Sequence, residues 1–190
     1  MPRNYADKSP TAYQRLPKYK KDDAAWMRAL LARVEVGILA TCYDDQPFAF
    51  PTNFWFDETS HQIVFHSNIT GRMRTNLERQ PQVSFVVYEK GRYLPSNAAL
   101  EFGVQYRSVM AFGPVEVVTD PDESRRLLYA LIKKYFPEME PGREYRPITD
   151  KELARTSVYV MQIEAWSGKE NWKEHAEQTD DWPALDAQGR

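Results

Sequence analysis

The 190-residue sequence has a single cysteine, Cys42, so no disulfide can form within the chain. No apolar run approaches the ~20 residues that a membrane-spanning helix needs, and the first residues lack the apolar core of a signal peptide. The formal charge of -2 gives no general attraction to nucleic acid or to an anionic membrane. These absences predict a cytoplasmic protein with neither kind of partner. Cys42 itself lies in the apolar stretch VGILATC, where a small buried side chain is expected.

Several signatures of catalysis and nucleotide binding are also missing. The chain has no GxSxG elbow, no Walker loop and no GxGxxG fingerprint, so hydrolase chemistry is not expected. The three histidines, His61, His66 and His175, show no metal-ligand spacing among themselves or with the lone cysteine, so no metal site is expected. No general acid or base is evident, and the catalytic residues stay unknown.

The chain does contain enough apolar material for one folded domain. It is 42% hydrophobic and 13% aromatic, which is typical of a globular protein. Charge gathers at the ends: residues 1–21 hold six basic side chains and one acidic one, and residues 173–190 hold five acidic and two basic ones. We expect an irregular basic N-terminal arm at 1–21, a domain at 22–172 and an acidic C-terminal tail at 173–190, with both ends docked loosely if at all.

Hydrophobic periodicity and turn signals predict mainly antiparallel strands with helices inserted in the connections. The predicted strands are 36–42, 48–56, 62–66, 82–88, 102–118 and 157–166. The predicted helices are 22–34, 71–80, 120–136 and 150–154, and 89–100 is expected to be a loop. This order favours a β-barrel with helical additions over a doubly wound α/β sheet.

The stretch FAFPTNFWF at 48–56 is an unusual strand. Pro51 cannot donate to a ladder, so it marks a sheet edge, a bulge or a place where pairing stops. Asn53 is a poor strand former between aromatic residues. Its amide offers both donors and an acceptor, as the polar edge of a flavin ring requires, whereas a strand end with local backbone bonding is the structural alternative.

The stretch VFHSNITGRMRTNL at 64–77 runs from a strand through a glycine into a helix. A helix start exposes unpaired backbone N–H groups and a partial positive charge. Gly71 lets a ligand approach the backbone, Arg72 adds a planar fork for phosphate oxygens, and Ser67 adds a hydroxyl. These features predict a phosphate cradle, with a solvated helix start as the alternative. His66 is either a packed side chain or a ligand contact.

The stretch SGKENW at 167–172 places Lys169 and Trp172 directly after the predicted last strand. A surface turn with Trp172 covering the edge of the core is the alternative to a ligand contact.

Taken in order, six segments resemble the pyridoxamine 5′-phosphate oxidase-like FMN-binding split barrels, and within them the nitroimidazole-resistance-type flavoproteins. The segments are GILAT, PFAFPTNFWF, IVFHSNITGRMRTNL, PQVSFVV, YRSVMAFGPVEVV and SGK. They cover about residues 30–172. The resemblance implies a six-stranded antiparallel split β-barrel that forms a homodimer, with FMN at the subunit interface.

The resemblance also implies which residues bind FMN. The phosphate would lie near His66, Ser67 and Arg72, and the flavin ring along the strand with Thr52 and Asn53. The strand around 105–108, together with Lys169 and Trp172, would approach the site from this subunit or from its partner. The full implied set is Thr52, Asn53, His66, Ser67, Gly71, Arg72, Lys169 and Trp172.

Two departures from the family pattern bear on function. Met73 stands where relatives often carry lysine, so a phosphate contact is lost or Arg74 substitutes for it. Gly-Lys-Glu-Asn-Trp at 168–172 stands where true pyridoxamine phosphate oxidases carry Arg-x-His, so vitamin B6 oxidation is not expected. The resemblance thus implies an FMN-dependent oxidoreductase that passes electrons from NAD(P)H to a small-molecule acceptor. The alternative is a non-catalytic barrel that binds flavin or haem.

Overall fold

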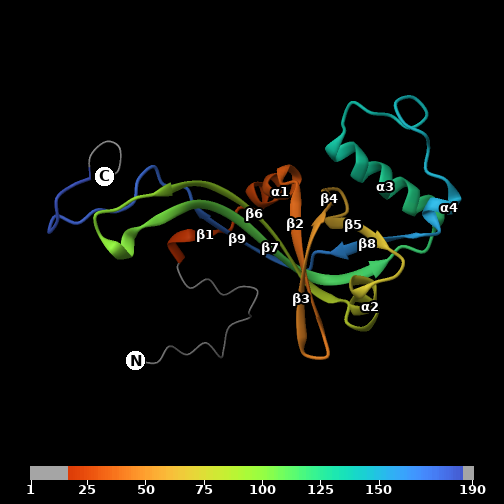
Figure 1. Cartoon of the computed structure of the whole chain (residues 1–190), viewed down its shortest axis with the longest axis horizontal. Helices are drawn as coiled ribbons and strands as arrows, with labels where there is room; N and C mark the ends of the chain where they lie inside the picture. The colour runs from red at the N-terminus through yellow and green to blue at the C-terminus, as the bar shows by residue number, and fades with distance from the viewer. Residues whose placement is uncertain (1–16, 186–190) are drawn as a thin grey trace.

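A computed structural model describes residues 17–185, and it confirms a mainly antiparallel β-fold with helices in the connections (Figure 1). The elements are the 3₁₀ turn Pro17–Tyr19, β1 Lys20–Lys21, α1 Ala24–Arg33, β2 Val36–Tyr43, β3 Gln46–Asn53, β4 Trp55–Asp57, β5 Gln62–Asn68, α2 Arg72–Arg79, β6 Gln82–Leu94, the 3₁₀ turn Ala99–Glu101, β7 Gly103–Val117, α3 Pro121–Tyr135, α4 Asp150–Leu153, β8 Thr156–Gln162 and β9 Ala165–Asn171. Residues 1–16 of the expected arm and 186–190 of the tail lie outside the described residues.

The strands pair in the order β3-β2-β6-β7-β8-β5-β4, and β9 pairs with β7 and β1. Within residues 17–185 the two end strands β3 and β4 have no further partner, so the sheet stays open as a split barrel. The described residues form nine strands, where six were expected. The segments 48–56 and 157–166, each expected as one strand, divide into β3 and β4 and into β8 and β9, and Lys20–Lys21 adds β1.

Strand β7 joins the two parts of the sheet. Up to Phe112 it pairs with β9, and from Val115 it pairs with β8. Gly113 lies at the change of partner, where a Cβ atom would approach the Gln162 carbonyl oxygen to 1.8 Å. Only glycine lets the strands come this close. The irregularity predicted at Gly113-Pro114 is this change of partner.

The predicted strand 48–56 is interrupted at Phe54, between β3 and β4, and not at Pro51. The Tyr135 hydroxyl accepts a hydrogen bond from the Phe54 N–H at 2.9 Å and lies 2.8 Å from the Phe54 carbonyl oxygen. It also lies 2.6 Å from the Glu35 carbonyl oxygen, so its single proton goes to one of the two carbonyls. Pro51 stays within β3, which pairs only with β2 in the described chain, so the predicted edge position is confirmed.

Side chains of β2, β6 and β7 alternate between an inner and an outer face. Leu39, Phe85 and Val109 face inward and are fully buried in the main core, against which α1 packs. Cys42 faces outward and is exposed, so the expectation of a buried cysteine was wrong. The cause is the two-residue period of a strand, which turns Cys42 away from the face that buries Thr41.

Two further expectations are corrected where β6 and β7 extend beyond α1 (Figure 1). The expected loop at 89–100 is strand as far as Leu94, which pairs with Gly103 after a bulge between Lys90 and Tyr93. The acidic tail does not dock loosely. Asn97 donates to the Thr179 carbonyl and accepts from the Thr179 N–H, both at 2.8 Å, and Ser96 donates to the Glu177 carbonyl at 2.6 Å.

The helices begin where their capping residues predict. Asp23 and Asp120 accept hydrogen bonds from the backbone N–H groups of Trp26 and Glu123, at the starts of α1 and α3. A capping box between Thr149 and Glu152 starts α4. None of the helices in residues 17–185 is both long and apolar enough to cross a bilayer. The cytoplasmic location stays a prediction.

Lys134 on α3 is enclosed beside the break at Phe54. Its ammonium donates to the Val34 carbonyl at 2.7 Å and lies 3.6 Å from the centroid of the Phe54 ring. Desolvation lowers the pKa of Lys134 from its ordinary value of 10.5 to about 8, although Glu35 opposes the shift. The unfolded chain therefore binds more protons than the folded chain between these two pH values, and stability rises with pH across that window.

Because of Lys134, we expect the free energy of unfolding to rise by about 1–2 kcal/mol between pH 8 and pH 10. The full effect of a pKa shift is ~1.4 kcal/mol per unit, and the expected rise is smaller because water partly solvates the ammonium. Denaturant unfolding of Lys134→Met at several pH values should lack this rise. Lys133→Met, which removes the exposed neighbouring ammonium, is the control and should retain it. Equal pH profiles for the Lys134→Met variant and the native chain would contradict this account.

Candidate functional site

The start of α2 is open to a ligand. Gly71 is the N-cap and has a φ of 131°, a conformation that favours glycine, and no side chain caps the helix. The first helical bond runs from the Thr75 N–H to the Gly71 carbonyl. The N–H groups of residues 72–74 therefore have no partner within the helix, and they carry the positive end of its dipole. This arrangement can bind an anion.

Arg72 is the cation best placed at this helix start. Its guanidinium lies 5.2 Å from the centroid of the Phe48 ring and 5.8 Å from that of the Tyr43 ring. No acidic side chain in residues 17–185 forms an ion pair with it. Both distances are within the range of cation–π attraction, and the N–H groups of the guanidinium stay able to bind an anion. Sequence reasoning missed Tyr43 and Phe48, although the β2–β3 hairpin brings them together.

Arg74 does not substitute for the missing lysine in this structure. Its guanidinium donates to Glu78 one turn along α2 and to the Ser157 hydroxyl at 2.8 Å. Met73 packs against the main core. Of residues 72–74, only Arg72 thus offers a cation without an acidic partner, and the cradle has one arginine and the backbone N–H groups.

Ser67 and His66 end β5 beside the same helix start. The Ser67 hydroxyl donates to the Asn68 carbonyl and shares a 2.9 Å hydrogen bond with the Tyr159 hydroxyl. His66 is the next residue and belongs to the opposite face of the strand. Desolvation by neighbouring atoms lowers the pKa of His66, so its imidazole is neutral at pH 7. Helix α2 covers the face of β5 that carries Ser67, because Arg74 bonds Ser157, the cross-strand partner of Ser67. The structure therefore brings Ser67, Gly71 and Arg72 to one side of β5 and leaves His66 on the other.

Thr52 and Asn53 lie at the far end of β3. The Thr52 hydroxyl donates to the Asn53 carbonyl at 3.1 Å, so local backbone bonding accounts for Thr52. The Asn53 side chain is exposed on the outer face. Five residues of strand, about 17 Å, separate Asn53 from Phe48 near Arg72. One edge of the sheet therefore carries an anion cradle near one end and a free amide at the other.

Lys169 and Trp172 are not gathered at this edge within one chain. Residues 167–171 belong to β9 and are not a turn after the last strand, which corrects the expectation for SGKENW. Strands β2, β6 and β7 stand between Lys169 and Asn53, a separation of roughly 19 Å along the sheet. Trp172 follows β9 with its ring 4.0 Å from the Arg107 guanidinium. Neither reaches Arg72 from the same chain.

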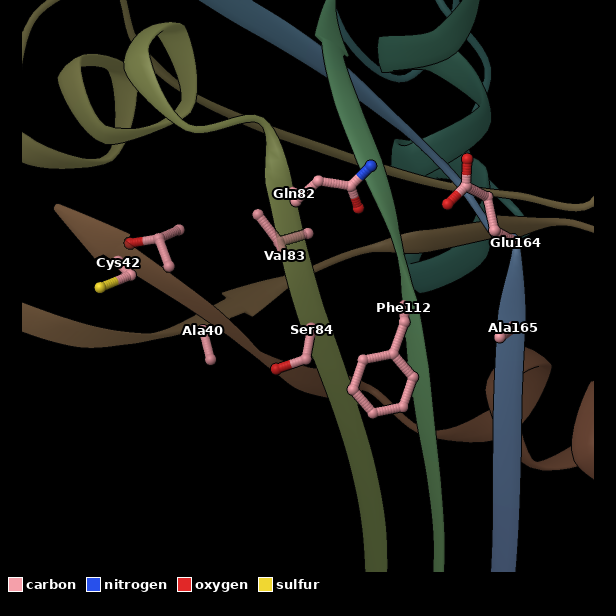
Figure 2. A pocket seen from close by; sticks show the side chains of 9 residues that line it. Ala40, Cys42, Gln82, Val83, Ser84, Phe112, Glu164 and Ala165 are labelled. Carbon is pink, nitrogen blue, oxygen red and sulfur yellow. The ribbon is translucent and has the colours of Figure 1, made fainter. Parts of the chain in front are cut away.

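No element of residues 17–185 covers the outer face of the sheet around this line of strands, and the face is largely apolar. One line of cross-strand neighbours runs through Ala40, Ser84, Phe112 and Ala165, which Figure 2 shows on β2, β6, β7 and β9 around an open hollow. Further along the same face, several large apolar side chains are exposed: Val36 by 47%, Tyr88 by 58% and Met110 by 39%. Such a patch on a folded domain is typical of a binding surface. Asn53 belongs to this face.

No group of three or more metal-ligating His, Cys, Asp or Glu side chains occurs in residues 17–185.

A family model described as pyridoxamine 5′-phosphate oxidase matches residues 23–170, which is most of the chain and includes the helix start and its neighbouring strands. The chain belongs to the pyridoxamine 5′-phosphate oxidase family. No curated protein is similar enough in sequence to match the chain significantly.

Solved structures share the fold of this family member. The flavocytochrome Anf3 from Azotobacter vinelandii has a TM-score of 0.79 at 23% identity, covering 92% of this chain and 78% of its own. The FAD- and haem-binding protein from Mycobacterium smegmatis has a TM-score of 0.76 at 25% identity, covering 86% and 78%. A candidate 5-nitroimidazole antibiotic resistance protein from Bacteroides thetaiotaomicron has a TM-score of 0.67 at 16% identity, covering 79% and 85%.

Proposed function

We propose that this protein binds a flavin, FMN in the first instance, with the phosphate at the start of α2. The observation that carries the proposal is the row of unpartnered N–H groups after Gly71, beside an arginine that has no acidic partner in the described chain. The family assignment supports it, because similar structures include proteins described as flavin-binding. Charge-assisted hydrogen bonds from Arg72 and the helix dipole would hold the phosphate.

The flavin ring would lie toward Asn53 on the outer face. Phe48 and Asn53 are about 17 Å apart along β3 and lie on its opposite faces, so a flavin that contacts both would pass around the free edge of this end strand. The Asn53 amide would donate to and accept from the polar edge of the ring.

The activity that fits this site is an oxidoreductase reaction with a small acceptor and NAD(P)H as the donor. Bound flavin supplies the electron transfer, and the protein residues bind it, orient it and shield it from water. Pyridoxamine phosphate oxidation is not proposed. Glu170 stands within the segment where those oxidases carry Arg-x-His, and it pairs with Arg107 at 2.7 Å and Lys21 at 3.3 Å. Arg107 and Lys21 are thus already paired with a carboxylate, and the Arg-x-His pair that holds a substrate phosphate in those oxidases is absent from this segment.

A second candidate function is flavin or haem binding without catalysis. The printed descriptions of two similar structures support this alternative, since one is a flavocytochrome and the other binds FAD and haem. These descriptions also make FAD an alternative to FMN.

We expect the purified protein to show the visible absorption bands of oxidised flavin and to release FMN when denatured. Chromatography of the released cofactor separates FMN from FAD, and an intense Soret band would indicate haem. Anaerobic NADPH should bleach the flavin bands slowly, whereas pyridoxamine phosphate should not. A protein that is colourless and stays so after incubation with FMN, FAD or haem would contradict the proposal. Flavin that no reductant bleaches would favour the non-catalytic alternative.

We expect Arg72→Ala to weaken FMN binding by about 10- to 150-fold, because a charge-assisted contact contributes roughly 1.5–3 kcal/mol. Riboflavin lacks the phosphate, and its affinity should stay nearly unchanged. Fluorescence titration of both ligands measures the difference. Arg143→Ala removes the same charge from an exposed position and is the control. Equal losses for FMN and riboflavin would place the phosphate elsewhere.

We also propose that two copies of the chain form a homodimer through the outer face of the sheet. The exposed apolar side chains on this face support a self-complementary interface, as in a two-fold dimer. In such a dimer the partner could bring its Lys169 close to the Asn53 of the first chain, which a single chain keeps roughly 19 Å apart. A shared site would then need both subunits.

We expect sedimentation at micromolar concentration to give twice the mass of the chain. Met110→Glu should shift the protein toward the monomer, because Met110 lies in the middle of the outer face and a carboxylate would be buried there without a partner. Leu100→Glu changes a side chain that is 96% exposed at the tip of the β6–β7 extension and should leave the dimer intact. A native chain that sediments as a monomer would contradict this prediction.

A further inference from the structure

Helix α2 carries a fully buried asparagine. Asn76 is 0% exposed, and its side-chain N–H donates to the hydroxyl of Thr41 on β2 at 2.8 Å. Thr41 is itself only 4% exposed. The Asn76 Oδ1 atom is buried and has no hydrogen-bond partner among the described residues. An asparagine here costs stability relative to an apolar side chain of similar size, so packing alone does not explain it.

The buried pair lies directly next to the anion cradle. Arg72 and Asn76 are four residues apart and therefore share one face of α2. That face lies on the β2–β3 hairpin, where Thr41 and Phe48 are cross-strand partners. Asn76 bonds Thr41, and Arg72 lies over Phe48. One turn further, Arg79 donates to the Tyr43 hydroxyl at 2.8 Å, so three side chains of one face are anchored on neighbouring positions of the hairpin.

We infer that the hydrogen bond between Asn76 and Thr41 fixes the rotation of α2 about its axis and so aims Arg72 and the free N–H groups at the phosphate. Neither residue touches the ligand, so both are positioning residues, and the inference rests on the proposed flavin site. A hydrogen bond restricts rotation because it has a direction, whereas apolar contacts of Leu77 next to it allow several rotations of similar energy.

The loop before α2 makes such an anchor necessary. A Cβ added to Gly71 would meet nothing within 4 Å, so the space beside the N-cap is open. No side chain caps the helix. In the first turn, Met73 packs against the main core and Arg74 donates to the Ser157 hydroxyl. The Asn76–Thr41 bond adds a fully buried, directional contact on the face of the helix that carries Arg72.

The test compares Thr41→Val, which keeps the shape but removes the hydroxyl, with Thr41→Ser, which keeps the hydroxyl. Titration of each variant with FMN and with riboflavin gives a ratio of affinities. We expect Thr41→Val to lose about 10-fold in FMN affinity, equivalent to ~1.4 kcal/mol, while riboflavin binding is retained. Thr41→Ser should bind both ligands like the native chain. The double variant Thr41→Val with Asn76→Leu restores an apolar interior and should still show the FMN-specific loss.

Ser124→Ala is the matched control, because it deletes another buried hydroxyl, on α3. It should lower stability without changing the FMN-to-riboflavin ratio. A ratio that is unchanged in Thr41→Val, or changed equally by Ser124→Ala, would overturn the inference.

A measurement without flavin separates this inference from the proposed function. Hydrogen exchange of the flavin-free protein should be faster over residues 71–76 in Thr41→Val than in Thr41→Ser, while exchange in α3 stays the same. If the native chain binds no flavin, the proposed function fails, and a faster exchange confined to α2 still supports the anchor. Equal exchange in the two Thr41 variants would overturn the anchor whether or not flavin binds.

Discussion

The fold depends on the interruption between strands β3 and β4 at Phe54. Strands β3 and β4 are neighbours in sequence, yet they lie at opposite ends of the strand order. A break leaves backbone N–H and C=O groups without ladder partners, and buried groups of this kind are costly. The Tyr135 hydroxyl lies within hydrogen-bonding distance of both groups of Phe54. Because this contact ends β3 at Asn53, it also fixes where the free amide lies on the open outer face.

Local sequence signals predicted the helices and the open start of α2 well. The caps at Asp23 and Asp120 and the glycine before Arg72 each act within one turn of backbone, so neighbouring residues suffice to identify them. The phosphate site was inferred in the same way, from residues that follow one another along the chain, and it stays a prediction. The resemblance to the family predicted the split barrel, which the structure and the family match confirm.

The errors come from pairing between distant strands. The interruption at Phe54 depends on Tyr135, which is 81 residues later, and no residue pattern near Phe54 predicts it. Strand β6 continues past residue 88 because β7 extends beside it, and β9 forms because β7 offers a second partner. Cys42 was expected to be buried because its stretch is apolar, but the outer face has no cover within the described chain.

The predicted site residues also differ according to whether they are close in sequence or brought together by strand pairing. Ser67, Gly71 and Arg72, which are close in sequence, lie on one side of β5 in the structure, whereas His66 belongs to its opposite face, and Lys169 and Trp172 lie across the sheet. Within the described chain, only one unpaired cation, Arg72, lies in the first turn of α2, because Met73 packs inward and Arg74 is paired with Glu78. Binding of a flavin phosphate would therefore depend mainly on Arg72, on the backbone of the first helical turn, and on the orientation of α2.

A crystal structure of the protein grown with FMN tests the central claim most directly. The account predicts phosphate oxygens within hydrogen-bonding distance of the Arg72 guanidinium and the backbone N–H groups that follow Gly71, with the ring reaching toward Asn53. Ordered FMN whose phosphate lies elsewhere, such as in the hollow beside Ala40 and Phe112, would contradict it.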